Sequence, residues 1–403
     1  MNTTPRFADV EYLLDGFEHV ETVQNFRDRL KLGRPLNVKL GIDPTSPDLH
    51  LGFMVVLSRL QRFAEAGHDV TLIIGDFTAR IGDPSGRNTM RPQLDAAAIE
   101  ANMKTYREQA GKVLDLERVR VRYNSEWLDK LGAADLVRLL SKTTVAQMLE
   151  RNDFHDRYST GTPISLHEFL YPVAQAYDSI AIEADVELGG SDQLFNLLLG
   201  RHYQRESGQL PQICATVPLL VGLDGVKKMS KSLDNYVGIA ENAQTQFGKL
   251  MSMGDDSMPT YARLAAFRSQ EDADALRAAL AAGRANPMEE KKRLAQEIVA
   301  LYHGAEGASA ARAYFERTVQ RKEIPTEALP DLDLGDAKRV ADVLLKAGFA
   351  KSRREAERLI SARGVKLDGI VVEDPRAAWP PAPAVVLSVG SRRFVRVRSG
   401  SNA

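Results

Sequence analysis

Cysteine is almost absent from this chain of 403 residues, and long hydrophobic runs are missing altogether. The single cysteine, Cys214, excludes an internal disulfide and any cluster of cysteine ligands, and it is typical of a reducing compartment. No run of about 18 apolar residues is available to cross a bilayer, and the N-terminus lacks the apolar core of a signal peptide. We therefore expect a cytoplasmic protein that does not insert into a membrane.

Several common catalytic motifs are missing too. There is no GxxxxGK[ST], which argues against a P-loop nucleotide site, and no GxGxxG after a strand, which argues against a nicotinamide site. HExxH and GxSxG are also absent, so zinc-peptidase and serine-hydrolase chemistry are not expected. No cage of protein ligands for a metal is visible, and we predict no tightly bound metal.

Charge is uneven along the chain although the total is −1. From Ala337 onward there are 14 Lys and Arg against 6 Asp and Glu, a balance of +8, so residues 1–336 carry −9. Such asymmetry indicates a basic accessory domain on an acidic body. The composition, 44% hydrophobic and 27% charged, is that of a globular protein, and the length predicts two or three domains.

Residues 38–53 have the pattern of a strand, a sharp turn and the start of a helix. The turn is rich in proline, and we predict Ser46 as the helix N-cap with Pro47 at the first helical position. His50 and Gly52 then fall in the first turn, where unpaired backbone N–H groups attract phosphate and glycine leaves room for a flat base. The alternative is an ordinary strand–helix unit with a surface histidine.

Strand-like and helical segments alternate over the first half of the chain. Their order predicts an α/β fold with a Rossmann-like, doubly wound parallel sheet. One or two amphipathic helices are expected at 8–32, and helical segments with polar breaks at 125–160. The other expected strands are 69–75, 119–123 and 184–188, and the other expected helices are 93–114, 165–180 and 194–206.

The alternation stops near residue 224, so the first predicted domain is 1–224. Residues 225–322 begin with a lysine-rich loop and continue as an α-helical region rich in Ala, Glu and Arg. Residues 323–336 carry two prolines and several acids, and we predict a linker there. The basic remainder, 337–403, is predicted to be a small separate α+β domain.

One face of the helix near 165–180 is unusually polar. Tyr171, Gln175 and Asp178 are spaced by 4 and 3 residues, which places a phenol, an amide and a carboxylate on one side of a helix whose flanking residues are mostly apolar. These groups suit a small ligand that carries an ammonium and a hydroxyl. The alternative is a solvated polar face, because such triples are common on exposed helices.

Residues 224–232 form the sharpest local signal. An Asp-Gly turn leads into a loop with three lysines and two serines, KKMSKS. Lysines are mobile point charges that suit a phosphate chain whose charge grows as a bond breaks. The alternative is a basic surface loop.

Polar residues also follow several predicted strands. His50 and Gly52 follow the first, Asp83 the second, and Gly190, Asp192 and Gln193 a later one. In an open parallel sheet the carboxyl ends of the strands converge on one crevice, so we expect these residues around one ligand site.

Together these motifs resemble the class I aminoacyl-tRNA synthetases. The segment HLGF at 50–53 looks like that class's HIGH signature, and KMSKS at 228–232 matches its second signature letter for letter. Within the class, the chain is similar to the bacterial tyrosyl-tRNA synthetase family over essentially its full length. Supporting segments are GIDPTSPDLHLG, IGDPSG, YPVAQAYD and GGSDQ.

The C-terminal 337–403 resembles the S-four-like RNA-binding module that ends bacterial members of the family. By this resemblance, 225–322 is an α-helical anticodon-binding domain that starts with the KMSKS loop, and 125–165 is a helical insertion through which two copies form a homodimer. The resemblance assigns RNA binding to the basic side chains of the module, namely Lys351, Arg353, Arg354, Arg358 and Lys366.

The same resemblance assigns roles in the first domain. It implies that His50, Thr45, Lys228 and Lys231 contact the phosphates of ATP and the transition state. It implies further ATP contacts from Gly52, Phe53, Gly190, Asp192, Met229, Ser230 and Ser232. It implies a tyrosine site made of Gly41, Asp43, Asp83, Asn124, Tyr171, Gln175, Asp178 and Gln193, with Asp178 accepting from the phenol.

The implied activity is tyrosine–tRNA ligation, with L-tyrosine, ATP, Mg²⁺ carried by ATP, and tRNA(Tyr) as partners. Two positions depart from the family pattern: Phe53 stands where the second signature histidine usually is, and Lys39 stands where many members have a tyrosine that contacts the phenol. Tryptophanyl-tRNA synthetase is the enzymatic alternative. A non-catalytic RNA-binding paralogue is the alternative from another class, and Phe53 is its support.

Overall fold

The computed structural model describes residues 7–84, 96–321, 329–390 and 393–398. The chain divides into two compact units: unit 1 comprises Met1–Asn242 and Lys249–Tyr302, and unit 2 comprises Ala243–Gly248 and His303–Ala403. Ser85 and Gly86 of the IGDPSG segment lie outside the described residues.

Unit 1 is built on a six-stranded sheet in the order β1-β6-β5-β2-β3-β4. Its strands are β1 His19–Glu21, β2 Asn37–Ile42, β3 Asp69–Ile74, β4 Val119–Tyr123, β5 Val186–Gly190 and β6 Ile213–Val217. Its early helices include α1 Val10–Leu14, α2 Val23–Leu30, α3 Leu51–Glu65, α5 Ala96–Ala110, α10 Leu170–Ala181 and α11 Leu194–Glu206. The other helices of this part are α4 Thr78–Ile81, α6 Ser125–Leu128, α7 Ala133–Leu140, α8 Val145–Met148, α9 Asn152–Ser159, η1 Leu166–Phe169 and η2 Ser191–Gln193.

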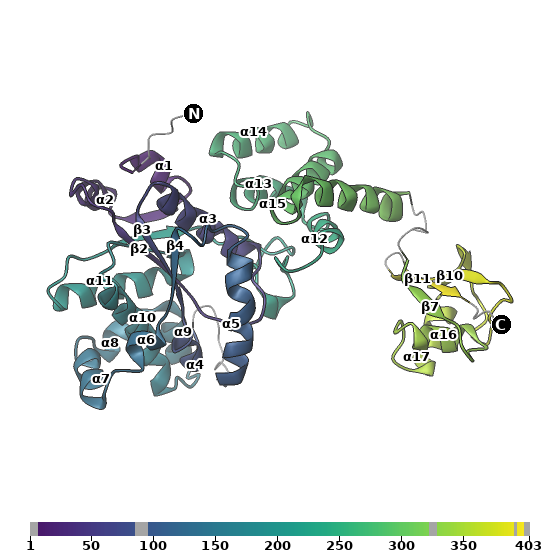
Figure 1. The fold of residues 1–403 in the computed structure, drawn as a ribbon, viewed down its shortest axis with the longest axis horizontal. Coiled ribbons are helices and arrows are strands. Elements are labelled where there is room, and N and C mark those ends of the chain that lie inside the picture. Colours follow the sequence, from purple (N-terminus) through teal and green to yellow (C-terminus); the bar gives the residue numbers. More distant parts are fainter. Residues whose placement is uncertain (1–6, 85–95, 322–328, 391–392, 399–403) are drawn as a thin grey trace. The chain divides into compact units, whose positions relative to one another are not determined.

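Strands β2 to β6 run parallel, which confirms the predicted parallel sheet for these strands. The connection β2–α3–β3 leads in one direction along the sheet, and β5–α11–β6 leads in the other. Right-handed crossovers therefore put α3 and α11 on opposite faces (Figure 1). The strand order reverses between β2 and β5, so a ligand crevice is expected at their carboxyl ends.

The core of this sheet follows from its apolar strands. Val38, Leu40 and Ile42 of β2 are at most 5% exposed, and the last five residues of β3 are all buried. Helix α3 covers them with a buried stripe that includes Leu57, Leu60 and Phe63. Both faces of a parallel sheet are covered in this way, which explains why these strands are near-continuous apolar runs.

Two local predictions are wrong. Helix α3 begins at Leu51 rather than at Pro47, and its N-cap is His50, whose side chain accepts a hydrogen bond from the Gly52 N–H. The predicted helical segment 8–32 also contains strand β1, which pairs antiparallel with β6. The sheet is therefore mixed, and β1 forms its edge.

The helical character predicted within 225–322 is confirmed for the described residues from 243 to 320. The elements are η3 Lys231–Leu233 before it, then α12 Ala243–Leu250, η4 Asp255–Ser257, α13 Met258–Leu264, α14 Gln270–Ala281, α15 Pro287–Phe315 and the π-helix η5 Glu316–Gln320. Within α15 the backbone is not helical at Gly304, which has φ 72°. Glycine reaches such an angle without steric cost, so it marks the break in this long helix.

The C-terminal part of unit 2 is a five-stranded sheet, β7-β11-β10-β8-β9, with two helices on one side (Figure 1). A core around Leu344, Ile360 and Leu387 joins the helices to the sheet. Strand β7 lies within the range predicted as a linker and pairs parallel with β11, so the sheet begins before residue 337. The elements are β7 Asp331–Asp333, α16 Val340–Lys346, α17 Arg353–Ser361, β8 Val365–Leu367, β9 Ile370–Val371, β10 Ala384–Val389 and β11 Arg393–Arg398.

Candidate active site

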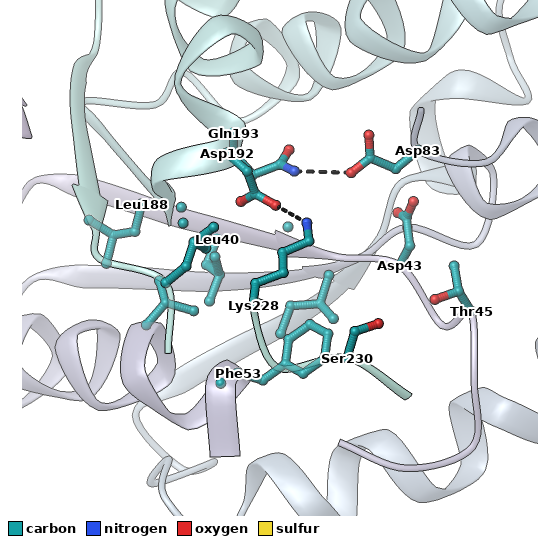
Figure 2. A pocket seen from close by; sticks show the side chains of 18 of the residues that line it. Leu40, Asp43, Thr45, Phe53, Asp83, Leu188, Asp192, Gln193, Lys228 and Ser230 are labelled. Carbon is teal, nitrogen blue, oxygen red and sulfur yellow. Dashed lines mark hydrogen bonds and ion pairs between the residues drawn. The ribbon is translucent and has the colours of Figure 1, made fainter. Parts of the chain in front are cut away.

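A cavity of about 470 Å³ opens at the carboxyl ends of β2 and β5 (Figure 2). Every residue predicted for contact with ATP or tyrosine lines it, whichever strand, helix or loop supplies it. The lining includes Gly41, Asp43, Thr45, His50, Gly52, Phe53, Asp83, Asn124, Tyr171, Gln175, Asp178, Gly190, Asp192, Gln193, Lys228, Met229, Ser230, Lys231 and Ser232. The structure thus brings together segments that are up to about 190 residues apart, as the topology of the sheet requires.

His50 is fixed by its capping role. Its Nδ1 accepts from the backbone N–H of Gly52 at 3.2 Å, so in the neutral ring the proton sits on Nε2, which is left as a donor. Burial lowers the pKa of His50 to about 4, and the positive charges of Lys231 and Lys228 contribute to this shift. The ring is therefore neutral near neutral pH and can donate one hydrogen bond to a phosphate oxygen.

Glycines keep two parts of the cavity open. A Cβ on Gly52 would lie 3.0 Å from the ring of His50, and a Cβ on Gly190 would lie 2.8 Å from Oδ1 of Asp192. A side chain at either position would displace the polar group beside it. The two glycines therefore preserve the position of a donor at one strand end and of an acceptor at another.

The lysines of the KMSKS loop are paired at rest. Lys228 Nζ lies 2.7 Å from Asp192, and the two side chains point toward one another in Figure 2. Lys231 Nζ lies 2.9 Å from Asp48 and 5.6 Å from the centre of the Tyr236 ring. Asp48 and Tyr236 were not predicted as site residues, because an acid in a turn and a tyrosine after a loop carry no distinctive pattern.

Phe53 takes part in the site through its ring. The ring is half-buried and lies 4.6 Å, centre to centre, from the imidazole of His50. It lines the same wall of the cavity as Ser230 and Lys228 (Figure 2). Phe53 thus restrains the histidine by packing, a role that needs no hydrogen-bond donor.

Asp178 and Tyr171 come from helix α10, as predicted. Asp178 is 4% exposed and accepts hydrogen bonds from Trp127 Nε1 at 2.7 Å and from Asn124 Nδ2 at 3.4 Å. Burial raises its pKa to about 7, although Lys39, Trp127 and Asn124 act in the opposite direction. Burial also raises the pKa of Tyr171 far above its ordinary value, so the phenol stays neutral.

A ring of polar side chains closes around part of the predicted tyrosine site. Gln193 Nε2 donates to Asp83 at 3.0 Å (Figure 2), and Asn196 Nδ2 donates to Gln193 Oε1 at 2.9 Å. Arg151 donates to Asn196 Oδ1 at 3.0 Å and to the second oxygen of Asp83 at 2.9 Å. A further bond runs from Asn196 Nδ2 to Gln175 Oε1 at 3.0 Å. Each side chain is therefore oriented by its neighbours in the ring.

Four of the residues that orient this site were missed from the sequence. Thr78 donates to Asp43 at 2.7 Å and accepts from Asn124 at 3.1 Å, and Trp127 holds Asp178. Arg151 and Asn196 complete the polar ring. Only Asn196, one helical turn after Gln193, carried a signal, since spacing of three residues on a helix places both on one side.

The predicted RNA-binding side chains lie in unit 2, and all five are exposed. Helix α17 begins after Ser352, whose side chain accepts from the Glu355 N–H, and it carries Arg353, Arg354 and Arg358. Arg353 pairs with Asp342 at 2.7 Å. The other two predicted residues are Lys351, just before the helix, and Lys366, on β8.

Neither a cluster of metal ligands nor a membrane-spanning helix is found among the described residues. No group of three or more His, Cys, Asp or Glu side chains there could hold a metal ion. Nor does any helix in the described ranges combine the length and the apolar composition needed to cross a bilayer.

Family models match two parts of the chain. Residues 31–320 match the model described as tRNA synthetases class I (W and Y), and residues 338–377 match the S4 domain. The first covers the cavity and the helices after it, and the second covers α16, α17, β8 and β9.

Curated relatives match over nearly the whole chain. A protein of Moorella thermoacetica, named tyrosine–tRNA ligase, is 50% identical over 374 residues, which is 93% of this chain and 90% of the relative. A protein of Bordetella avium with the same name is 49% identical, with 97% and 96% covered.

Solved structures give the same fold at low identity. Tyrosyl-tRNA synthetase of Archaeoglobus fulgidus, in complex with L-tyrosine, has a TM-score of 0.62 and 20% identity, with 75% of this chain and 98% of that chain covered. A truncated mitochondrial tyrosyl-tRNA synthetase of Aspergillus nidulans has a TM-score of 0.62 and 21% identity, with 77% and 93% covered.

Proposed function

Because the chain belongs to the tyrosine–tRNA ligases of the class I tRNA synthetase family, we propose that it joins L-tyrosine to tRNA(Tyr) with ATP. The observation that carries the proposal is that one cavity is lined both by the buried carboxylate of Asp178 and by two lysines, Lys228 and Lys231. Asp178 accepts hydrogen bonds from two side chains of the protein. The carboxylate suits a phenol, and the lysines suit a triphosphate.

In the first step the tyrosine carboxylate attacks the α-phosphorus of ATP. A new bond forms between carboxylate oxygen and phosphorus, and the bond to the bridging oxygen breaks, giving tyrosyl-adenylate and pyrophosphate. The substrate supplies the nucleophile, so the side chains are needed only for positioning and for stabilising charge. Mg²⁺ brought by ATP would shield the phosphate charges.

The phosphate side of the site acts through donors. His50 offers Nε2–H, because its Nδ1 is occupied by the Gly52 N–H. Lys228 and Lys231 exchange Asp192 and Asp48 for the departing pyrophosphate, and Asp192 is thereby released to accept from the ribose hydroxyls. The donors meet charge that increases as the bond breaks, which is the condition for rate acceleration.

The tyrosine side acts through oriented acceptors. Asp178 accepts from the phenol, with Asn124 beside it, and Gln175, Tyr171 and Asp83 receive the ammonium. A phenylalanine in this position would leave the buried Asp178 without the hydrogen bond from the phenol, which disfavours phenylalanine binding. Rejection of phenylalanine through a missing hydroxyl is already an established property of tyrosyl-tRNA synthetases, and the contacts of Asp178 account for it here.

In the second step the tyrosyl group passes to a hydroxyl of the 3′-terminal adenosine of tRNA, and AMP leaves. The cations of α17 and β8 support a role in holding the tRNA, since Lys and Arg bind its phosphates. The α-helical region 225–322 is proposed to contact the anticodon.

We further propose a homodimer formed through 125–165. This segment and the residues close to its ends expose several large apolar side chains, which a partner copy would cover. These side chains are Tyr123, Val137, Leu140, Val145, Tyr158 and Leu166. Sedimentation of the full chain across a range of concentrations tests the dimer.

The reducing cytoplasm is the location proposed from the single cysteine, and fractionation of cells tests it.

Pyrophosphate exchange into ATP, measured with each amino acid in turn, tests the activity. Tyrosine-dependent exchange followed by tyrosylation of tRNA is the expected result. Exchange with tryptophan alone would replace the proposal with tryptophan ligation. Binding of tRNA without exchange for any amino acid would favour a non-catalytic paralogue.

A further inference from the structure

A buried ion pair lies beside the cavity without lining it. Lys39 and Glu187 occupy paired positions on β2 and β5, their charged atoms are 3.0 Å apart, and each side chain is 1% exposed. Removing two charges from water costs several kcal/mol per ion, so a buried pair is poor evidence of a gain in stability. A pair placed between the two strands that form the crevice therefore calls for another explanation.

The pair is tied to Gln175 at two points. Lys39 Nζ donates to the main-chain oxygen of Gln175 at 3.3 Å, and Gln175 Nε2 donates to Glu187 Oε1 at 3.0 Å. Asn196 occupies the other end of the Gln175 amide, at 3.0 Å from Oε1. The amide can therefore face the cavity in only one orientation, with its oxygen as the acceptor.

The remaining contacts of the pair are filled. Glu187 Oε2 accepts from Ser179 Oγ at 3.1 Å and from the Gln212 amide. Cys214, at the register position opposite Glu187 on β6, experiences both charges, and burial raises the pKa of its thiol. Within this group of described residues, Gln175 is the one that lines the cavity.

The pair also acts on Asp178, one turn further along α10. Lys39 lowers the pKa of Asp178 and Glu187 raises it. The other groups that face this carboxylate, Trp127 from α6 and Asn124 before it, donate hydrogen bonds and favour the charged form. Lys39 is thus the nearby cation for a carboxylate that is otherwise desolvated.

On the basis of the proposed tyrosine activation, we propose that Lys39 and Glu187 are positioning residues for tyrosine. Glu187 sets the orientation of the Gln175 amide toward the substrate ammonium. Lys39, held on the Gln175 main-chain oxygen one turn before Asp178 on α10, favours the ionised form of this carboxyl, which accepts a hydrogen bond from the substrate phenol. The pair therefore serves both ends of the amino acid from outside the cavity.

The test is the pH profile of kcat/KM for tyrosine in pyrophosphate exchange, from about pH 6 to about pH 9, because kcat/KM reports ionisations of the free enzyme. The wild-type acid limb is expected where Asp178 titrates, at about 7. K39Q should move this limb upward and E187Q should move it downward. A shift of about one unit upward lowers kcat/KM at about pH 7 by about fivefold, and kcat at saturating tyrosine changes less.

The opposite signs distinguish this role from a merely structural one. Loss of packing would lower activity in both single variants without moving the limb in opposite directions. The matched control is K39Q/E187Q, which keeps hydrogen-bonding groups at both positions and removes both charges, so its limb should return toward that of the wild type. If K39Q fails to fold, E187Q and the double variant still give the predicted directions.

Three results would overturn the inference: unchanged profiles in both single variants, shifts of equal sign, or a double variant with the larger shift of K39Q. Each of these leaves tyrosine-dependent exchange by the wild type intact. Absence of exchange by the wild type would instead refute the proposed function. The two failures are therefore distinguishable.

Discussion

Replacing Lys231 with alanine should separate the resting role of this lysine from its role in the reaction. At rest Lys231 pairs with Asp48 at 2.9 Å, and the two side chains are 21% and 39% exposed. Exposed pairs of this kind contribute about 0.2–1 kcal/mol, so K231A should lower the free energy of unfolding by less than about 1 kcal/mol.

The effect on adenylation should be far larger. A charged donor that meets the developing charge of pyrophosphate in a desolvated site is typically worth about 3–4 kcal/mol, which corresponds to about 10² to 10³ in rate. By the proposed roles tyrosine binds elsewhere in the cavity, so its dissociation constant should stay nearly unchanged. Single-turnover formation of tyrosyl-adenylate measures the rate, and quenching of intrinsic fluorescence by tyrosine measures the affinity.

The matched control is D48N. It removes the same resting ion pair but keeps the lysine, so its unfolding free energy should fall as in K231A while its adenylation rate stays within about threefold of the wild type. A loss in D48N equal to that in K231A would mean that the ion pair, rather than the free lysine, carries the rate. A large loss of tyrosine affinity in K231A would contradict the assigned role of the loop.

Three further outcomes are expected. D178N should reduce discrimination between tyrosine and phenylalanine at least about tenfold in pyrophosphate exchange, because the acceptor of the phenol proton loses its charge; equal discrimination would mean that the phenol is read elsewhere. R151M should lower the free energy of unfolding by about 3–5 kcal/mol in urea titrations, because Asp83 loses its buried cation; an unchanged midpoint would show that the pair is not needed for stability. A variant with glutamate at both Arg354 and Arg358 should raise the KM for tRNA at least about tenfold and leave exchange unchanged; normal tRNA kinetics would exclude α17 from the interface.

The parallel sheet and the membership of the cavity could be predicted from the sequence. Short apolar runs such as 69–74 are typical of strands buried on both faces of a parallel sheet. Because the carboxyl ends of parallel strands meet on one edge, the sequence also predicts that His50 and Asp192 lie in one site. Edge strand β1 could not be predicted, because its three residues have no apolar pattern and owe their conformation to β6.

The support of the site was also beyond prediction, and the reason is distance along the chain. Trp127 reaches Asp178 across 51 residues, and Arg151 reaches Asp83 across 68. Neither residue belongs to a motif, and each lies in or beside a short helix whose placement depends on packing. The predicted start of helix α3 was wrong for a local reason. Ser46 and Pro47 have the residue types of an N-cap and a first helical position, but the N-cap is His50, whose imidazole accepts the capping hydrogen bond.

The two lysine–aspartate pairs also affect which anions the cavity can bind. Because Lys228 pairs with Asp192 and Lys231 pairs with Asp48, the positive charges of both lysines are already neutralised by carboxylates of the protein. Inorganic phosphate alone could pair with a lysine only if Asp192 or Asp48 lost its ion-pair partner. Adenosine alone could hydrogen-bond to Asp192 only if Lys228 lost its ion-pair partner. By the proposed roles, ATP supplies both sets of partners at once, because its ribose hydroxyls bind Asp192 and its phosphates bind the lysines. The two halves of the nucleotide should therefore bind poorly apart and cooperatively when joined, so that the loop rejects metabolites that share only one half.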